Sequence, residues 1–211
     1  MIGALSFLRH QQQHDIDTFK EHWLKVHGPL AAVLPGVKKY TQNHFIPTAL
    51  LTNALARSLE VDGLAAMFFE NEADRDLCYS CRQEAICDED SLQFIGATAR
   101  FVTDVQRLIP AKKPPAAAKA VFAVLATSTL NARKQADKIA ALDGLTELTF
   151  HGITKPGAIP FQPRTQISMP LQAIIEVSAD KAEILEQARD AFVPAGEAGV
   201  AIFSVQEYSL V

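Results

Sequence analysis

The sequence predicts an α+β protein made of two tandem ferredoxin-like units, each with the element order βαββαβ. Strand patterns and helix patterns occur in the same order in both halves of the chain, and a segment rich in Pro, Ala and Lys separates the halves. In each unit, helices would cover one face of a four-stranded antiparallel sheet and leave the other face bare. We therefore expect the two bare faces to pack together and to enclose a barrel-like space.

Composition excludes several classes of function. The chain has 211 residues, 48% of them hydrophobic and 21% charged, with a formal net charge of −4. This balance gives no support for binding nucleic acid or an anionic membrane surface. No apolar run approaches the ~18–20 residues that span a bilayer, and the N-terminal stretch lacks the basic leader of a signal peptide. We expect a cytoplasmic protein.

In the first half, alternation and apolar runs predict strands at 2–9, 37–46, 61–69 and 101–109. A helix should begin after Asp15 or Asp17 and be interrupted at Gly28-Pro29, with one more helical turn over 30–34. A short helix is expected within 47–57 and a longer one from Asn71 to about Ile86. A looser stretch containing Asp88-Glu89-Asp90 should precede the last strand.

The second half repeats this order without repeating the sequence. We expect strands at 120–127, 145–153, 171–177 and 200–210, and helices at 131–141 and 180–192. The segment 154–170 contains four prolines, which predicts a long ordered loop or lid. Two domains follow from this pattern, residues 1–110 and residues 119–211, joined by a linker at 110–118.

The stretch from Phe19 to Leu30 is the most informative part of the chain. It holds the only Trp, Trp23, and two of the six His, His22 and His27. At helical spacing, Ile16, Phe19, Trp23 and Val26 form an apolar side. His27 lies four residues after Trp23, so it leans toward that buried side, whereas His22 lies at its margin.

A polar strand face follows this helix. Alternation in 37–46 puts Tyr40, Gln42 and His44 on one face of the predicted strand and Lys39, Thr41, Asn43 and Phe45 on the other. An imidazole suits proton transfer near neutral pH, and a phenol can donate to a developing oxyanion. The alternative is that His27 only caps its helix while Tyr40 and His44 are ordinary sheet residues.

The three cysteines are clustered at Cys78, Cys81 and Cys87. An odd number in one segment argues against a framework of disulfides. Cys78 and Cys81 form a C-x-x-C within the predicted helix, without a second pair of zinc ligands nearby. We expect reduced packing residues and no metal site.

Several of these residues form one pattern, which is F-x-x-H-W-x-x-x-H-x-P-L from Phe19, P-G-V-x-x-Y-x-Q-N-H from Pro35, and D-G-L from Asp62. This pattern resembles the EthD family of dimeric α+β-barrel proteins. The resemblance covers about residues 2–109. The second half lacks these motifs, which suggests a fused and degenerate partner that completes a dimeric-α/β-barrel-like arrangement.

The resemblance implies a small-molecule enzyme without a cofactor, either an oxidoreductase or monooxygenase, an isomerase, or a dehydratase, with a role in catabolism. Its substrate would be a hydrophobic or aromatic oxygenated molecule bound in the barrel. His27 would be the general acid or base, with Tyr40 and His44 as catalytic partners and Trp23, His22, Phe19 and Gln42 as substrate-binding residues. Relatives of this barrel can bind haem through a His, but the chain has no haem-specific motif. The resemblance also allows a homodimer. A binding or accessory protein that uses the same cavity without turnover is the alternative.

Overall fold

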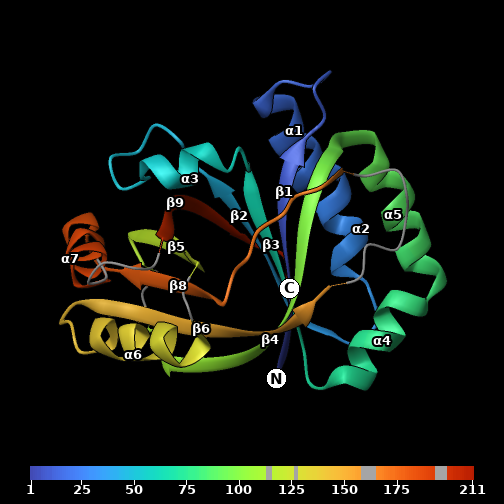
Figure 1. Cartoon of the computed structure of the whole chain (residues 1–211). Coiled ribbons are helices and arrows are strands. Elements are labelled where there is room, and N and C mark those ends of the chain that lie inside the picture. The colour runs from blue at the N-terminus through green and yellow to red at the C-terminus, as the bar shows by residue number, and fades with distance from the viewer. Residues whose placement is uncertain (113–115, 126–127, 158–164, 193–198) are drawn as a thin grey trace.

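The computed structural model describes residues 1–112, 116–125, 128–157, 165–192 and 199–211. They form an α+β fold in which an eight-stranded antiparallel barrel is flanked by helices (Figure 1). The strands are β1 (Ile2–His10), β2 (Val37–Phe45), β3 (Gly63–Phe69), β4 (Ile95–Ile109), β5 (Ala118–Leu125), β6 (Leu145–Pro156), β7 (Thr165–Gln166), β8 (Ala173–Ala179) and β9 (Gly199–Ser209). The helices are α1 (Ile16–His22), η1 (Trp23–His27), α2 (Gly28–Ala32), α3 (Ala54–Ser58), α4 (Glu72–Ser80), α5 (Arg82–Phe94), α6 (Thr129–Ala140) and α7 (Ala182–Phe192).

The barrel closes within one chain. Its strand order is β1-β3-β2-β9-β5-β8-β6-β4, and β4 pairs again with β1. The strands of the first half are contiguous in this ring, in the order β4-β1-β3-β2, and those of the second half follow as β9-β5-β8-β6. Antiparallel pairing of β2 with β9 and of β4 with β6 joins the halves. The two sheets therefore meet edge to edge, and every strand of the ring has a neighbour on both sides.

Apolar side chains from both halves fill the barrel interior. The largest of them are Phe7, Phe45, Phe68, Phe101 and Phe203. The rings of Phe45 and Phe203 stack across the junction of the halves, with centroids 4.0 Å apart. The enclosed space expected between the two sheets is thus largely occupied, because alternating residues of all eight strands point into a ring of this size.

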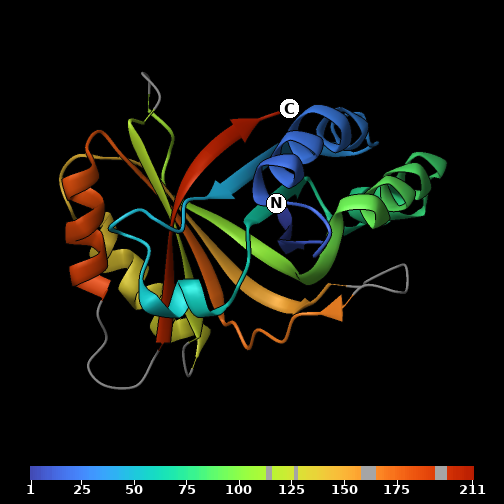
Figure 2. The ribbon, with the colours of Figure 1, turned by 90° about the horizontal axis from the view of Figure 1, so that it is seen from above.

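Helices α6 and α7 of the second half lie on one side of the barrel, and helices α1, α2 and α5 of the first half lie on the other (Figure 2). On the second-half side, α6 and α7 pack on the sheet through a continuous apolar cluster that includes Phe122, Phe150 and Phe192. On the first-half side, the packing is divided into two smaller clusters, one around Tyr40 and Phe69 and one around Trp23 and Phe94. This second side leaves room for a cavity.

The helix that carries the histidines continues through Gly28-Pro29, contrary to the expected interruption. Pro29 has no N–H to donate, and the chain adapts by widening the preceding turn into the π-helix η1, in which the N–H of Gly28 bonds to the carbonyl of Trp23. The wider turn also rotates the following residues. Val26, expected on the apolar side, is 46% exposed, whereas His27 faces inward.

The predicted helix from Asn71 to Ile86 is two helices, which break at Cys81. Cys81 ends α4 and caps α5, and its Sγ accepts from the N–H of Glu84 at 3.4 Å. The stretch containing Asp88 and Asp90 is helical, not loose, because α5 runs to Phe94.

Two strands also differ from the sequence-based bounds. β4 begins at Ile95 and β6 runs to Pro156. Residues 158–164 of the expected lid, 113–115 of the linker and 126–127 of the predicted strand lie outside the described residues, whereas Thr165 and Gln166 pair with β4 as β7. Among the described helices, none is both long and apolar enough to cross a membrane.

Gly63 sets how closely η1 can approach the sheet. A Cβ at this position would lie 2.5 Å from Cζ3 of Trp23 and 2.8 Å from the carbonyl oxygen of Asn43. We predict that Gly63→Ala lowers the free energy of unfolding by about 1–3 kcal/mol, the usual cost of overpacking. The measurement is urea unfolding. Gly152→Ala, on β6, is the matched control because its nearest contacts would be at 3.4 Å. Equal stability of the two variants would contradict the prediction.

Candidate functional site

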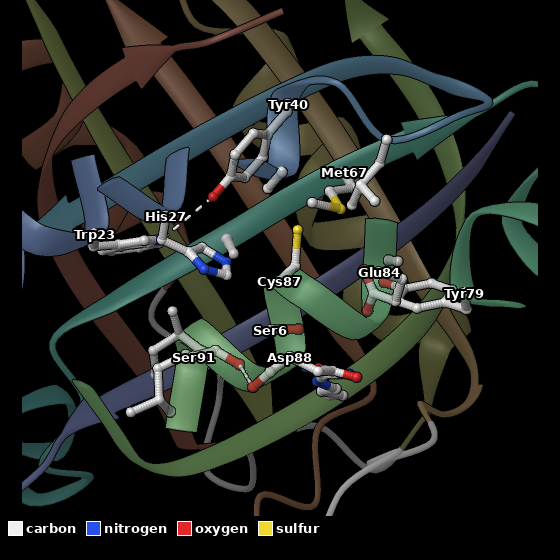
Figure 3. Close-up of a pocket in the computed structure, with 17 residues that line it drawn as sticks. Ser6, Trp23, His27, Tyr40, Met67, Tyr79, Glu84, Cys87, Asp88 and Ser91 are labelled. Atoms are coloured by element: carbon white, nitrogen blue, oxygen red, sulfur yellow. Dashed lines mark hydrogen bonds and ion pairs between the residues drawn. The ribbon is translucent and has the colours of Figure 1, made fainter. Parts of the chain in front are cut away.

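A cavity of about 50 Å³ lies between the sheet and the helices of the first half; we call it the helix–sheet cavity. Helices η1, α2 and α5 form one wall, and β1 to β4 form the other. Trp23, His27 and Tyr40 line it together with Cys87, Tyr79 and Arg100. In Figure 3 the His27 ring and the Cys87 sulfur both point toward the centre of this space. The cavity lies outside the barrel, whereas the family resemblance implies a substrate bound inside it.

Asp90 on α5 binds both histidines of the predicted helix. His27 Nδ1 lies 2.9 Å from one carboxylate oxygen of Asp90, and His22 Nε2 lies 3.0 Å from the other. Burial alone would raise the pKa of Asp90, but the hydrogen bonds from His27 and His22 hold that pKa below its usual value. Asp90 is therefore a carboxylate that accepts from Nδ1 of His27 and leaves Nε2 of the same ring for other partners.

Tyr40 receives two hydrogen bonds at its hydroxyl oxygen. The indole N–H of Trp23 donates at 3.3 Å and the amide of Gln42 donates at 3.0 Å. Because the hydroxyl oxygen already accepts two hydrogen bonds, the O–H of Tyr40 can donate to a third group. Burial raises the pKa of Tyr40, so the group is a neutral donor.

His44 lies behind Trp23 and is not part of the cavity wall. Its ring stacks on the indole, with centroids 4.6 Å apart and planes 7° apart. Its Nε2 lies 3.0 Å from Oε1 of Gln42, whose amide nitrogen donates to the carbonyl of Trp23 at 2.8 Å. Burial, with a smaller effect of Lys20, lowers the pKa of His44 to about 4. His44 is thus a neutral ring that donates to Gln42.

The structure brings together only part of the predicted site. Trp23, His27 and Tyr40 share the helix–sheet cavity, while Gln42 and His44 support them from the strand. Phe19 is fully buried and packs against the rings of Trp23 and Phe94 at 5.6 Å. His22 contacts Asp90 and the ring of Phe94.

Sequence reasoning missed Asp90 and Cys87. Asp90 was assigned to a loose acidic stretch, and its three-residue spacing from Cys87 on a helix would have been the signal. Burial raises the pKa of Cys87 to about 12, so it is a thiol at neutral pH. Cys78, Cys81 and Cys87 are all free thiols. Among the described residues, no group of three or more His, Cys, Asp or Glu side chains is arranged to hold a metal ion.

A larger cavity of about 310 Å³ adjoins the first. The two share Ala4, Ser6, Tyr79 and Arg100, and the outer one adds apolar surface from Phe101 and other side chains. Arg75 packs over the ring of Tyr79 at 5.2 Å. Burial raises the pKa of Tyr79 to about 12. The helix–sheet cavity is thus the smaller, polar inner end of this space, and the adjoining cavity is its larger outer end.

His151, which had no recognisable sequence context, lies inside the barrel. Its Nε2 is 3.0 Å from Glu176, which also binds Lys119 at 2.5 Å. Burial alone would raise the pKa of Glu176, but Lys119 and His151 hold it well below its usual value. Asn43 of β2 reaches the same carboxylate at 3.4 Å. This network ties the two halves together.

The fold matches solved structures over nearly the whole chain. An anthrone oxidase-like protein has a TM-score of 0.58 at 11% identity, covering 99% of this chain and 93% of its own. A candidate monooxygenase from Fusobacterium nucleatum has a TM-score of 0.62 at 9% identity, covering 97% and 91%. Another, from Lactobacillus acidophilus, has a TM-score of 0.58 at 10% identity, covering 98% and 93%. At these identities the likeness concerns the fold alone.

Sequence comparison identifies one known domain in the chain. No sequence among the curated proteins matches this chain. The EthD domain matches residues 11–98, a range that contains β2, β3 and all the residues singled out above from Phe19 to Asp90. The first half of this chain is therefore similar to the EthD domain over residues 11–98.

Proposed function

We propose that the helix–sheet cavity is the active site of a small-molecule enzyme, with His27 as general acid or base. The observation that carries this proposal is the Asp90–His27 pair at the wall of a cavity that Tyr40 also lines. Nδ1–H of His27 donates to Asp90, so the neutral ring presents an unprotonated Nε2. Asp90 orients this ring and stabilises the imidazolium that forms when it accepts a proton.

The two groups have complementary roles at a carbonyl compound. Nε2 of His27 accepts a proton from a carbon next to the carbonyl or conjugated with it, and the C–H electron pair moves to give an enolate. The Tyr40 hydroxyl donates to the enolate oxygen, since Trp23 and Gln42 already occupy its lone pairs. His44 is a positioning residue that holds Gln42. The proton on His27 then returns to another atom of the substrate.

The enolate is common to the three reaction classes that the family resemblance implies. Return of the proton to a different carbon gives an isomerase, and transfer to a departing hydroxyl gives a dehydratase that releases water. Reaction of a stabilised enolate with oxygen, without a cofactor, gives an oxidoreductase or monooxygenase. A hydrophobic or aromatic oxygenated substrate would find apolar surface at Phe101 and Val102 and polar groups at Arg75 and Arg100 in the outer cavity of about 310 Å³.

We use anthrone as the test substrate, because one structural neighbour is an anthrone oxidase-like protein and anthrone has an acidic C–H opposite its carbonyl. Anthrone and O₂ give anthraquinone and water, which balances the reaction. We predict that the wild type accelerates oxygen uptake and that His27→Ala lowers the rate by about 10²–10⁴-fold, the range for lost acid–base catalysis. An oxygen electrode and the absorbance of anthraquinone give the rate.

His14→Ala is the matched control, since this His binds the carbonyl of Gln93 and does not line the cavity. It should react as fast as the wild type. Equal rates in a folded His27→Ala variant would overturn the assignment of His27. Saturable anthrone binding without any turnover would instead support the alternative, a binding or accessory protein, which the filled interior of the barrel favours.

We predict that His44 makes stability depend on pH. An unfolded His has a pKa near 6.5, whereas burial lowers the pKa of folded His44 to about 4. The unfolded chain therefore takes up a proton first, and the stability from neutral His44 is complete above about pH 6.5 and is lost as pH falls toward 4. His44→Gln should lose less unfolding free energy between neutral pH and pH ~4.5 than the wild type. Urea unfolding at both pH values tests this, and parallel losses would refute it.

We also propose that the chain is a tandem of two ferredoxin-like units, residues 1–110 and 119–211, with the linker at 110–118. The matching strand orders β4-β1-β3-β2 and β9-β5-β8-β6 support this division. Cleavage at a protease site inserted within 110–118 should leave the halves associated on gel filtration, because β2–β9 and β4–β6 pairing and the shared interior hold them. Dissociation of the cleaved chain without denaturant would contradict this.

A further inference from the structure

A third cavity, of about 540 Å³, lies at the end of the barrel where β1 finishes and β3 begins. We call it the barrel-end cavity. It has no lining residue in common with the helix–sheet cavity. His10, the last residue of β1, and Asp62, just before β3, both line it.

His10 and Asp62 form a partly buried hydrogen-bonded pair, in which the carboxylate orients the imidazole. Nδ1 of His10 lies 2.8 Å from Oδ2 of Asp62, and the backbone N–H of His10 donates to the same oxygen at 2.7 Å. Asp62 is 16% exposed at its side chain and His10 is 31% exposed. Because a carboxylate can only accept, the neutral ring donates from Nδ1 and presents Nε2 as an acceptor.

The backbone around this pair is unusual at two points. The pairing of β1 with β4 shifts register between Arg9 and His10, which turns His10 away from the regular sheet. Glu60 has a positive φ of 49°, a strained conformation for a residue with a side chain. Arg9 fixes this strained turn by donating to the carbonyl of Glu60 at 2.5 Å and to that of Leu59 at 3.0 Å. Strained turns of this kind cluster at functional sites.

The lining indicates what the cavity would bind. Phe45 and Phe203, stacked on each other, and Val61 give an apolar and partly aromatic wall. The charged side chains balance, with Arg9 and Arg57 against Glu60 and Asp62. A neutral aromatic body therefore fits better than an ion, and Nε2 of His10 calls for a hydrogen-bond donor. We propose that the barrel-end cavity binds a neutral aromatic molecule whose hydroxyl group donates to Nε2 of His10.

The test uses 2-naphthol as probe and 2-methoxynaphthalene, which has the same ring system but no donor, as its partner. NMR of the full chain reports on both cavities, because the single Trp gives one indole N–H signal in the helix–sheet cavity and His10 gives imidazole signals in the other. We predict saturable shifts of the His10 signals by 2-naphthol and about tenfold weaker binding of 2-methoxynaphthalene, the effect of one lost hydrogen bond.

His10→Ala should weaken 2-naphthol binding by a similar factor, about tenfold, while His14→Ala should bind it as the wild type does. The comparison of the two probes on the wild type needs no variant, so it remains decisive if His10→Ala does not fold. Unmoved His10 signals, equal affinity for the two probes, or unchanged affinity in a folded His10→Ala variant would each overturn the proposal. Shifts confined to the indole signal would place the ligand in the helix–sheet cavity alone.

Discussion

The packing of Trp23 against the sheet is the contact on which the arrangement of the first half depends. Its ring stacks on His44 and meets the backbone of β3 at Gly63, where no side chain would fit. Its indole N–H and its carbonyl both hold partners from β2. Since the ring and the backbone are fixed together, the turn that follows has one orientation, and that turn is where the chain widens into a π-helix. His27 therefore faces the cavity because these contacts hold Trp23 in one position.

This dependence explains what could be predicted from the sequence. Strand alternation placed Tyr40, Gln42 and His44 on one face because it is a local property of extended backbone. Helical spacing failed at Val26 because Pro29 removes one donor and the chain absorbs the loss by changing the hydrogen-bond period. Such a change involves a whole turn at once. Pro29 alone therefore does not indicate which side chains the wider turn will expose.

The two carboxylates that hold imidazoles share one property that the sequence does not reveal, since each acquires its role from a partner far away in the chain. Asp90 is 63 residues from His27, and Asp62 is 52 residues from His10. The sequence predicts a loose stretch at Asp90 because three acidic residues in a row are usually exposed to solvent. In the fold this side chain is buried, and its contacts with His27 and His22 keep it charged. How much space the barrel itself encloses also depends on residues that are far apart in the chain. Whether a barrel of eight strands is hollow depends on the size of its inward side chains, and here five of those are Phe.

The two halves have the same strand order but differ in how the layer between their helices and their sheet is packed. In the second half, Phe122, Phe150 and Phe192 pack in one continuous apolar layer between the helices and the sheet. The same layer in the first half contains Tyr40, Gln42, His44 and their partners, whose burial has to be offset by hydrogen bonds. A barrel that closes within one chain allows this asymmetry, because the two sheets need not be copies of each other. The tightly packed half pairs with both edges of the first-half sheet, through β2–β9 and β4–β6, and so fixes the sheet on whose outer face the polar half forms its cavity.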